Sequence, residues 1–230
     1  MSSVSLLIVP EISAELRGSI LLGLTGAEGV AIEPSGPALL SEIEDLAHAL
    51  AAEHFGRPPG EITALEPARR LYKAFGIDPT RTRPSSEALL RRVLQGKPLP
   101  RISNAVDLCN HGALRFLLPI GLYDAGKIKG AVTLRRGRAG ESYPGIRKED
   151  VHLEGRPILA DAEGPFGNPT SDSLRTCVDG TTRSLWMVIF APSGYPRDRL
   201  EGHLAFVRDG MARHLPAPGG SLTTSGLLVP

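Results

Sequence analysis

The chain has 230 residues, 41% of them apolar, so it is long enough to bury the core of a large domain. A formal net charge of +1 by itself indicates neither a nucleic-acid partner nor an acidic one. Two cysteines are too few for a disulfide scaffold or a four-thiolate zinc site, the six histidines lack metal-ligand spacing, and no apolar run approaches the roughly 20 residues that span a bilayer. We therefore expect a cytoplasmic protein with no metal, no other cofactor and no membrane contact.

The N-terminal part begins with two apolar runs, residues 4–9 and 30–32, which predict strands separated by glycine-rich turns. No Lys or Arg precedes the first run, so it fits a strand better than a signal peptide. Apolar residues then recur at helical spacing from Pro37 to Phe55, and Gly56 follows as a stop.

Three further helices are predicted before the centre of the chain. Two short ones cover residues 66–75 and 85–94, and the irregular loop between them presents Arg81 and Arg83 to solvent. The third has its cap at residue 103 or 104 and runs to residue 118, where a proline follows.

The remainder of the chain reads as sheet followed by one helix. The predicted elements are a hairpin of residues 120–123 and 128–134, strands at 156–159, 175–178 and 185–190, and an amphipathic helix at 197–215. From residue 216 onward Gly, Pro, Ser and Thr dominate, which predicts a flexible tail over residues 216–230.

Charge is unevenly distributed along the chain. Residues 69–101 carry nine bases against Asp78 and Glu87, whereas residues 1–66 carry ten acids against two bases. Arginine matches phosphate geometry, so this cluster, with Arg81, Arg83, Arg91 and Arg92, is a candidate for binding phosphates. A solvated helix face, whose arginine stems cover apolar surface, is the alternative.

Several motifs follow one another in the second half of the chain. They are Arg101-Ile-Ser-Asn-Ala-Val-Asp-Leu-Cys-Asn-His111, Pro119-Ile-Gly-Leu-Tyr-Asp124, Val132-Thr-Leu-Arg-Arg136 and Ala162-Glu-Gly-Pro-Phe-Gly167. In order and spacing they resemble the B3/B4 domain, the tRNA-editing module of the beta subunit of phenylalanyl-tRNA synthetase. Freestanding relatives of this module resemble the chain still more closely, because they also carry a block like residues 164–176.

This resemblance implies an α/β (α+β), three-layer fold of mixed sheets and helices. It implies one domain over residues 1–215, with a strand-helix extension over about residues 1–65. It also implies a pocket that receives an amino acid wrongly attached to the 3′ end of a tRNA. The chain lacks room for an aminoacylation core and has no Gly-x-x-x-x-Gly-Lys phosphate loop, so it is not expected to be a complete synthetase.

Site residues carry over from the resemblance position by position. Asn110 matches an asparagine of the motif and Asp107 an aspartate, while Asn104 and Arg135 fall at polar positions beside the pocket. Two groups of the synthetase pocket are missing: its histidine falls at Gly121, and its glutamate at Met187 or Val188. Tyrosine specificity is therefore not carried over.

A dense polar block beside a Gly-Pro-Phe-Gly turn offers replacements for the missing groups. We expect Asn110, Ser171 and Asp172 to be catalytic, since hydroxyls and amides can stabilise a developing oxyanion without a metal. The expected substrate-binding residues are Asn104, His111, Arg135, Glu163, Gly164, Gly167, Asn168 and Thr170. A turn capped by its own side chains is the alternative for residues 168–172.

Cys109 and His111, on either side of Asn110, raise the question of a catalytic thiol with a histidine base. Cys109 and His111 lie two apart on a helix and do not face each other, so a thiol–histidine dyad is not expected. Asp107 and His111 share a face, so a structural hydrogen bond between them is preferred over a pocket role.

The function that the resemblance implies is trans-editing: hydrolysis of a mischarged aminoacyl-tRNA ester, with the aminoacylated 3′ end of tRNA as partner and no DNA. The expected tRNA-binding residues are then Arg81, Arg83, Arg91 and Arg92. Two alternatives remain open. One is a non-catalytic tRNA- or RNA-binding module, and the other is a binding protein for small, amino-acid-like molecules.

Overall fold

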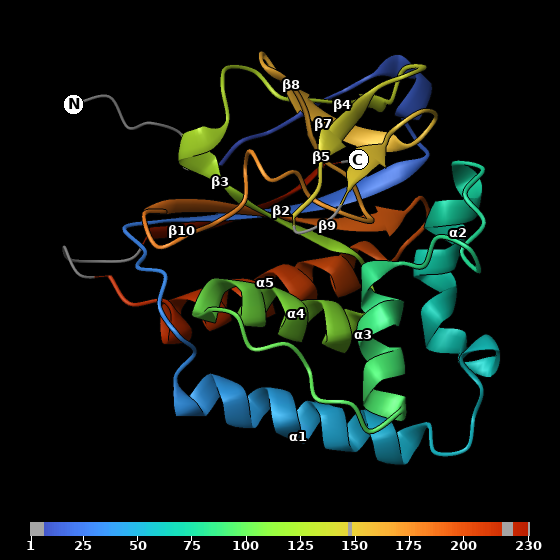
Figure 1. Ribbon diagram of the computed structural model, residues 1–230, viewed down its shortest axis with the longest axis vertical. Coiled ribbons are helices and arrows are strands. Elements are labelled where there is room, and N and C mark those ends of the chain that lie inside the picture. Colours follow the sequence, from blue (N-terminus) through green and yellow to red (C-terminus); the bar gives the residue numbers. More distant parts are fainter. Residues whose placement is uncertain (1–6, 147–148, 218–222, 230) are drawn as a thin grey trace.

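The computed structural model describes residues 7–146, 149–217 and 223–229, and these form the α+β fold expected from the sequence. Figure 1 shows three layers: a small sheet above, a central sheet in the middle and helices below. Among the described residues, none of the helices combines the length and apolar character that spanning a bilayer requires.

The central sheet has the strand order β10-β2-β9-β3, and all neighbours are antiparallel. These strands are β2 (Ile20–Glu28), β3 (Ile120–Asp124), β9 (Ser184–Pro192) and β10 (Thr223–Val229). Leu185, Met187 and Ile189 of β9 pack with the helices, whereas Trp186 and Val188 pack with the upper sheet. Because both faces of β9 are covered, its sequence is a continuous apolar run instead of an alternating one.

The upper sheet has the order β1-β4-β7-β8, with β1 and β4 parallel and the other pairs antiparallel. Its strands are β1 (Glu11–Ile12), β4 (Thr133–Arg136), β7 (Pro157–Asp161) and β8 (Gly164–Gly167). A separate two-stranded sheet, β5 (Ser142–Pro144) with β6 (Asp150–His152), lies beside it.

Helices form the lower layer and one end of the molecule (Figure 1). They are α1 (Pro37–Glu53), α2 (Glu66–Ala74), α3 (Ser85–Leu94), α4 (Asn104–Phe116) and α5 (Arg197–His214). Short 3₁₀ turns occur at Ala14–Leu16, Pro59–Glu61, Thr63–Leu65 and Ala125–Lys127. At the start of α4, the Val106 backbone N–H donates to the Ser103 hydroxyl at 3.4 Å, as the predicted cap requires.

The predicted helices agree with α1 to α5 to within a few residues, but several predicted strands are wrong. Residues 120–124 and 133–136 do not pair as a hairpin: β3 joins β9, and β4 joins β7 and β1. Residues 30–32 and 175–178 are not in strands, and β2 was not predicted. Of the first apolar run, residues 4–6 lie outside the described residues and residues 7–9 are not in a strand.

The tail prediction is also wrong over part of its length. Thr223–Val229 forms β10, which pairs with β2 along the edge of the central sheet. A Gly/Ser/Thr-rich composition gives no signal for such pairing, because the backbone hydrogen bonds come from a strand distant in the sequence. Residues 218–222 and 230 of the predicted tail lie outside the described residues.

Candidate functional site

A cavity of about 570 Å³ lies between α3, α4, β3 and the segment of residues 168–178. Such a volume is in the range of small-ligand pockets. The lining residues are Ser85, Leu89, Ile102, Val106, Cys109, Asn110, Ala113, Ile120, Leu122, Ile146, Asn168, Pro169, Thr170, Ser171, Asp172, Leu174, Cys177 and Val178.

The lining changes character with depth. We define the floor as its buried apolar residues from α4 and β3, which are Cys109, Ala113, Ile120 and Leu122, all less than a tenth exposed. The half-buried polar residues Asn110, Ser171 and Asp172 form the polar wall. The rim consists of Ile102, Ile146 and Leu174, which are 51%, 39% and 54% exposed.

Asn168 builds the turn that brings Ser171 and Asp172 to the cavity. Its amide oxygen accepts from the backbone N–H groups of Thr170 at 2.7 Å and Ser171 at 3.1 Å. Its amide nitrogen donates to the Tyr143 hydroxyl at 2.7 Å, and that hydroxyl donates to the Ser171 carbonyl. Asn168 is therefore structural, so the capped-turn interpretation is right for this side chain.

Among the described residues that line this cavity, Asp172 is the only acidic or basic one. The Leu122 backbone N–H donates to Asp172 Oδ2 at 3.3 Å, while the buried Oδ1 has no hydrogen bond among the described residues. Burial raises the pKa of Asp172 to about 7, although the nearby Tyr123 hydroxyl and the Leu122 N–H favour the ionised form. A carboxyl group with a pKa near 7 can exchange a proton at neutral pH.

Two glycines make room for the Tyr123 ring beside Asp172. A Cβ atom added to Gly121 would lie 2.1 Å from the Tyr123 hydroxyl oxygen, and one added to Gly167 would lie 2.3 Å from it. The Tyr123 hydroxyl is buried and has no hydrogen bond of normal geometry among the described residues. Gly121, where the synthetase pocket carries histidine, is thus a packing requirement of this chain.

The structure brings five of the predicted site residues to one cavity: Asn110, Asn168, Thr170, Ser171 and Asp172. Thr170 shares a 2.9 Å hydrogen bond with the Tyr72 hydroxyl, which holds the segment against α2. The remaining predicted substrate-binding residues are absent from the lining.

These other residues have partners elsewhere, so their predicted positions at the pocket are wrong. The Asn104 amide donates to the Ala31 carbonyl at 3.0 Å and ties α4 to the segment after β2. Arg135 forms two hydrogen bonds to the Glu141 carboxylate, at 2.8 and 2.7 Å. Glu163 is exposed and pairs with Arg175 at 3.3 Å, while Gly164 and Gly167 lie in β8.

The expected Asp107–His111 hydrogen bond is not found among the described residues. Asp107 accepts instead from the Ser35 hydroxyl at 2.6 Å and from the Ile102 backbone N–H at 3.0 Å. His111 packs edge-on against Phe206 of α5, and burial lowers its pKa to about 4. It is a neutral core histidine, not a group of the cavity.

The four arginines predicted to bind tRNA are not equally available. Arg91 pairs with the buried Glu87 at 3.0 Å, and Arg92 donates to the Pro98 carbonyl at 2.8 and 3.2 Å. Arg81 and Arg83 are exposed in the loop that ends at Ser85, a lining residue of the cavity. Arg81 pairs with the exposed Asp78 at 3.7 Å, so among the described residues neither Arg81 nor Arg83 has a buried ion-pair partner.

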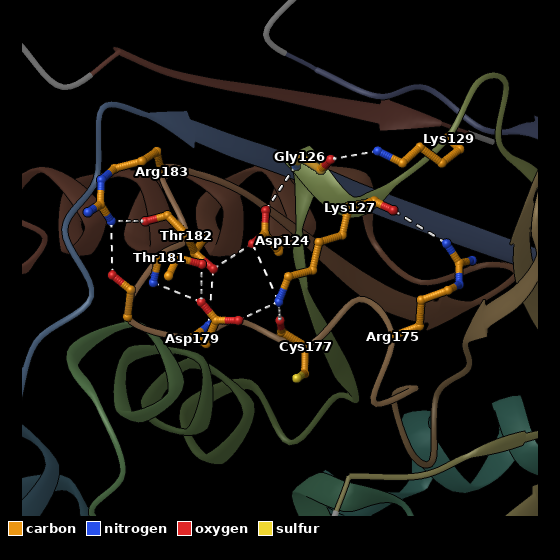
Figure 2. A network of polar contacts seen from close by, with 11 residues as sticks. Asp124, Gly126, Lys127, Lys129, Arg175, Cys177, Asp179, Thr181, Thr182 and Arg183 are labelled. Carbon is orange, nitrogen blue, oxygen red and sulfur yellow. Dashed lines mark hydrogen bonds and ion pairs between the residues drawn. The ribbon is translucent and has the colours of Figure 1, made fainter.

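A polar network holds the far end of the cavity segment in place (Figure 2). Lys127 Nζ donates to the Cys177 carbonyl at 2.7 Å and to the Asp179 carboxylate at 2.6 Å. The Thr182 hydroxyl donates to Asp124 at 2.6 Å, at the end of β3. Together these contacts fix residues 177–182 on the strand that supplies the floor.

Sequence reasoning missed Tyr143, which holds the turn before Ser171, Tyr123, which packs beside Asp172, and Lys127, which fixes residues 177–182. None of the three is among the residues that line the cavity. Gly121, two residues before Tyr123, was the local signal for this close packing, whereas the contact of Gly167 with the same ring is visible only in the structure. Nothing local in the sequence points to Lys127, because its partners lie some 50 residues away.

Known proteins are similar in sequence to the central part of this chain. The profile of the family described as B3/4 domain matches residues 67–194. The phenylalanine–tRNA ligase beta subunit of Chromobacterium violaceum is 29% identical over 161 residues, which are 67% of this chain and 18% of that protein. The same subunit of Streptomyces avermitilis is 32% identical over 93 residues, which are 40% of this chain and 11% of that protein.

The chain therefore spans less than a fifth of the length of these curated relatives. Among solved structures, an N-terminal fragment of the phenylalanyl-tRNA synthetase beta subunit from Pyrococcus horikoshii aligns with a TM-score of 0.47 and 15% identity. That alignment covers 94% of this chain and 50% of the other.

Proposed function

Because the chain belongs to the B3/4 domain family, we propose that it hydrolyses the ester bond of a mischarged aminoacyl-tRNA in trans. Its kinship with phenylalanine–tRNA ligase beta subunits makes a tRNA-related role the starting point. The observation that carries the proposal is the Asp172 carboxyl, with a pKa of about 7, in the wall of a cavity of about 570 Å³.

In this proposal the ionised Asp172 carboxylate removes a proton from a water molecule as that water attacks the ester carbonyl carbon. The Asn110 amide and the Ser171 hydroxyl face the same cavity and donate to the developing oxyanion. The tetrahedral intermediate then collapses and the bond to the ribose oxygen breaks. Asp172 returns its proton to that oxygen, which leaves a free amino acid and an uncharged tRNA.

The basic loop before α3 supports an RNA substrate. Arg81 and Arg83 are exposed beside Ser85, so they can contact backbone phosphates while the aminoacylated end enters the cavity. Arg91 and Arg92 are held by Glu87 and the Pro98 carbonyl, so we do not assign them to phosphate binding.

A panel of tRNAs carrying wrong amino acids tests the proposal directly. We expect at least one ester to be hydrolysed faster with purified protein than without it. The value of kcat/KM should rise with pH through about 7, since only the ionised Asp172 accepts a proton. Asp172→Asn should lower kcat/KM by roughly 10²- to 10⁴-fold and abolish this rise.

Glu163→Gln is the matched control, because it also converts a carboxylate to an amide but lies outside the cavity lining. Its rate and pH profile should stay those of the unaltered protein. Failure of every ester in the panel to react would refute the deacylase proposal.

A second candidate is a tRNA-binding module without catalysis. It is favoured by the loss of the synthetase pocket's histidine and glutamate, at positions that here hold Gly121 and the fully buried Met187 and Val188. In that case the protein would bind the tRNAs of the panel with an affinity that falls steeply with salt, but it would hydrolyse none of their esters.

A further inference from the structure

The floor of the cavity has almost no side-chain atoms that can form a hydrogen bond. Ile120 and Leu122 of β3 and Ala113 of α4 are apolar, and all are less than a tenth exposed. Cys109 supplies the floor's one side-chain heteroatom, a sulfur 3.8 Å from the Ile120 carbonyl oxygen. Burial raises the pKa of this thiol well above its usual value, so it stays neutral.

Two polar residues of the lining, buried Asn168 and half-buried Thr170, are already engaged in hydrogen bonds. Asn168 uses its amide oxygen for two backbone N–H groups and its amide nitrogen for Tyr143. The Thr170 hydroxyl bonds to that of Tyr72. The Asp172 carboxyl accepts from the backbone N–H of the floor residue Leu122, and its Oδ1 is buried. The remaining polar lining side chains, on Ser85, Asn110 and Ser171, belong to half-buried residues.

In the proposed mechanism the polar wall acts on the ester bond, and the apolar floor is left to hold the amino-acid side chain. An ester bond at the polar wall directs the amino-acid side chain toward the floor. A hydroxyl or a charge placed there would lose its water and gain no partner, which is costly. An apolar side chain would lose only contact with water.

We propose that the cavity selects esters of amino acids with apolar side chains and discriminates against hydroxyl-bearing and charged ones. This inference rests on the proposed deacylase function and specifies its substrate class. Recognition comes from the apolar floor. The Asp172 carboxyl, which accepts from the Leu122 N–H beside the floor, is assigned to the attacking water and not to the amino-acid side chain.

Valine and threonine provide the sharpest comparison, because their side chains have nearly the same shape and differ by one methyl against one hydroxyl. With one tRNA carrying either amino acid, we expect kcat/KM to be higher for the valyl ester by on the order of 10²-fold. Lysyl and aspartyl esters should react more slowly than the valyl ester. Equal rates for valine and threonine, or a preference for threonine, would overturn the inference.

Cys109→Ser changes the floor with little change in volume, by placing a hydroxyl where the sulfur lies. It should lower the valine-to-threonine ratio by roughly tenfold, the value of one neutral hydrogen bond. Ala51→Ser, on α1, is the control, because it also adds a hydroxyl at a site that is not exposed but Ala51 lies outside the cavity lining. Its valine-to-threonine ratio should stay that of the unaltered protein. If Cys109→Ser does not fold, Ala113→Ser makes the same test from the next turn of α4.

Binding separates a failure of the substrate class from a failure of the deacylase. Stable amide analogues, 3′-valylamino- and 3′-threonylamino-3′-deoxyadenosine, cannot be hydrolysed as esters but present the same side chains. Tighter binding of the valyl analogue, by tenfold or more, supports the selective floor even if no ester reacts. Equal or tighter binding of the threonyl analogue overturns it, whether or not esters are hydrolysed.

Discussion

The Asp172 carboxyl ionises at a different pH in the folded protein and in the unfolded chain. Burial raises its folded pKa to about 7 from an ordinary value of 3.8. Between these two values the unfolded chain is ionised and the folded protein holds the proton, so stability falls as pH rises through this window. Below about pH 4 both states are protonated and the penalty disappears.

Asp172→Asn should therefore stabilise the protein more at pH 8 than at pH 4, because asparagine stays neutral and can still accept the Leu122 N–H. Thermal unfolding of both proteins at the two pH values measures the difference. An equal shift in Tm at both values would contradict the expected ionisation.

Asp161→Asn provides a control of opposite sign. Burial raises the pKa of Asp161, but hydrogen bonds from Arg175 and two backbone N–H groups lower it overall. This carboxylate stabilises the fold above pH 3.8 and loses that contribution as pH falls below that value, so its replacement should cost more stability at pH 8 than at pH 2.

The close packing around Tyr123 gives a second test at a single residue. In Gly121→Ala the added methyl would meet the Tyr123 ring, at 2.1 Å from its oxygen, so the variant should lose about 1–3 kcal/mol of unfolding free energy. Gly202→Ala, on α5, meets no atom within 4 Å and should be neutral or slightly stabilising. Chemical denaturation compares the two, and equal stability would mean that the ring has room to move.

Among the elements, the segment of residues 168–182 depends on a lysine that lies outside it. Lys127→Met removes the donor to Cys177 and Asp179 but keeps most of the apolar stem (Figure 2). We expect faster amide hydrogen exchange in residues 177–182 and a higher KM for the substrate, with the core elements unchanged.

Lys129→Met is the matched control, because exposed Lys129 makes a single side-chain bond, at 3.3 Å, to the Gly126 carbonyl. It should alter neither the exchange of residues 177–182 nor KM. If both variants behaved alike, the effect would belong to lost surface charge and not to the network.

The helices were predictable because their signals are local. Apolar spacing and a Ser103 cap gave α4 to within two residues at its end, and α3 was predicted at its observed bounds. Strands were harder, since the partner of β3 is β9, far along the chain, and not the nearby β4. Two glycines within β2 imitate turns in the sequence, yet Gly23 faces two leucines of α5.

The cavity shows the same difference between local sequence signals and contacts with distant residues. The polar block of residues 168–172 was predicted from its own density, and its convergence with Asn110 was expected from the resemblance. Arg135 and Glu163 were misplaced because a charged side chain in a sequence does not reveal its partner. Their partners, Glu141 and Arg175, account for them within the protein.

For the whole molecule, the placement of arginines predicts how salt acts on RNA binding. Arg81→Glu with Arg83→Glu should weaken tRNA binding and reduce its dependence on salt, because phosphate contacts release counterions. Arg138→Glu with Arg197→Glu changes net charge equally, at exposed positions outside the basic loop. Electrophoretic or fluorescence titrations at several salt concentrations measure both. An equal effect of the two double variants would indicate general charge instead of a defined contact.

The register of the central sheet has a consequence for the speed of folding. In β2, Ile20 pairs with Pro192 and Glu28 with both Ser184 and Thr223, so this strand has no partner until distant parts of the chain arrive. Topologies dominated by such distant pairings fold slowly. During synthesis the apolar strand β2 is made before β9 and β10. Until these strands pair with it, β2 is exposed and can aggregate or bind to chaperones.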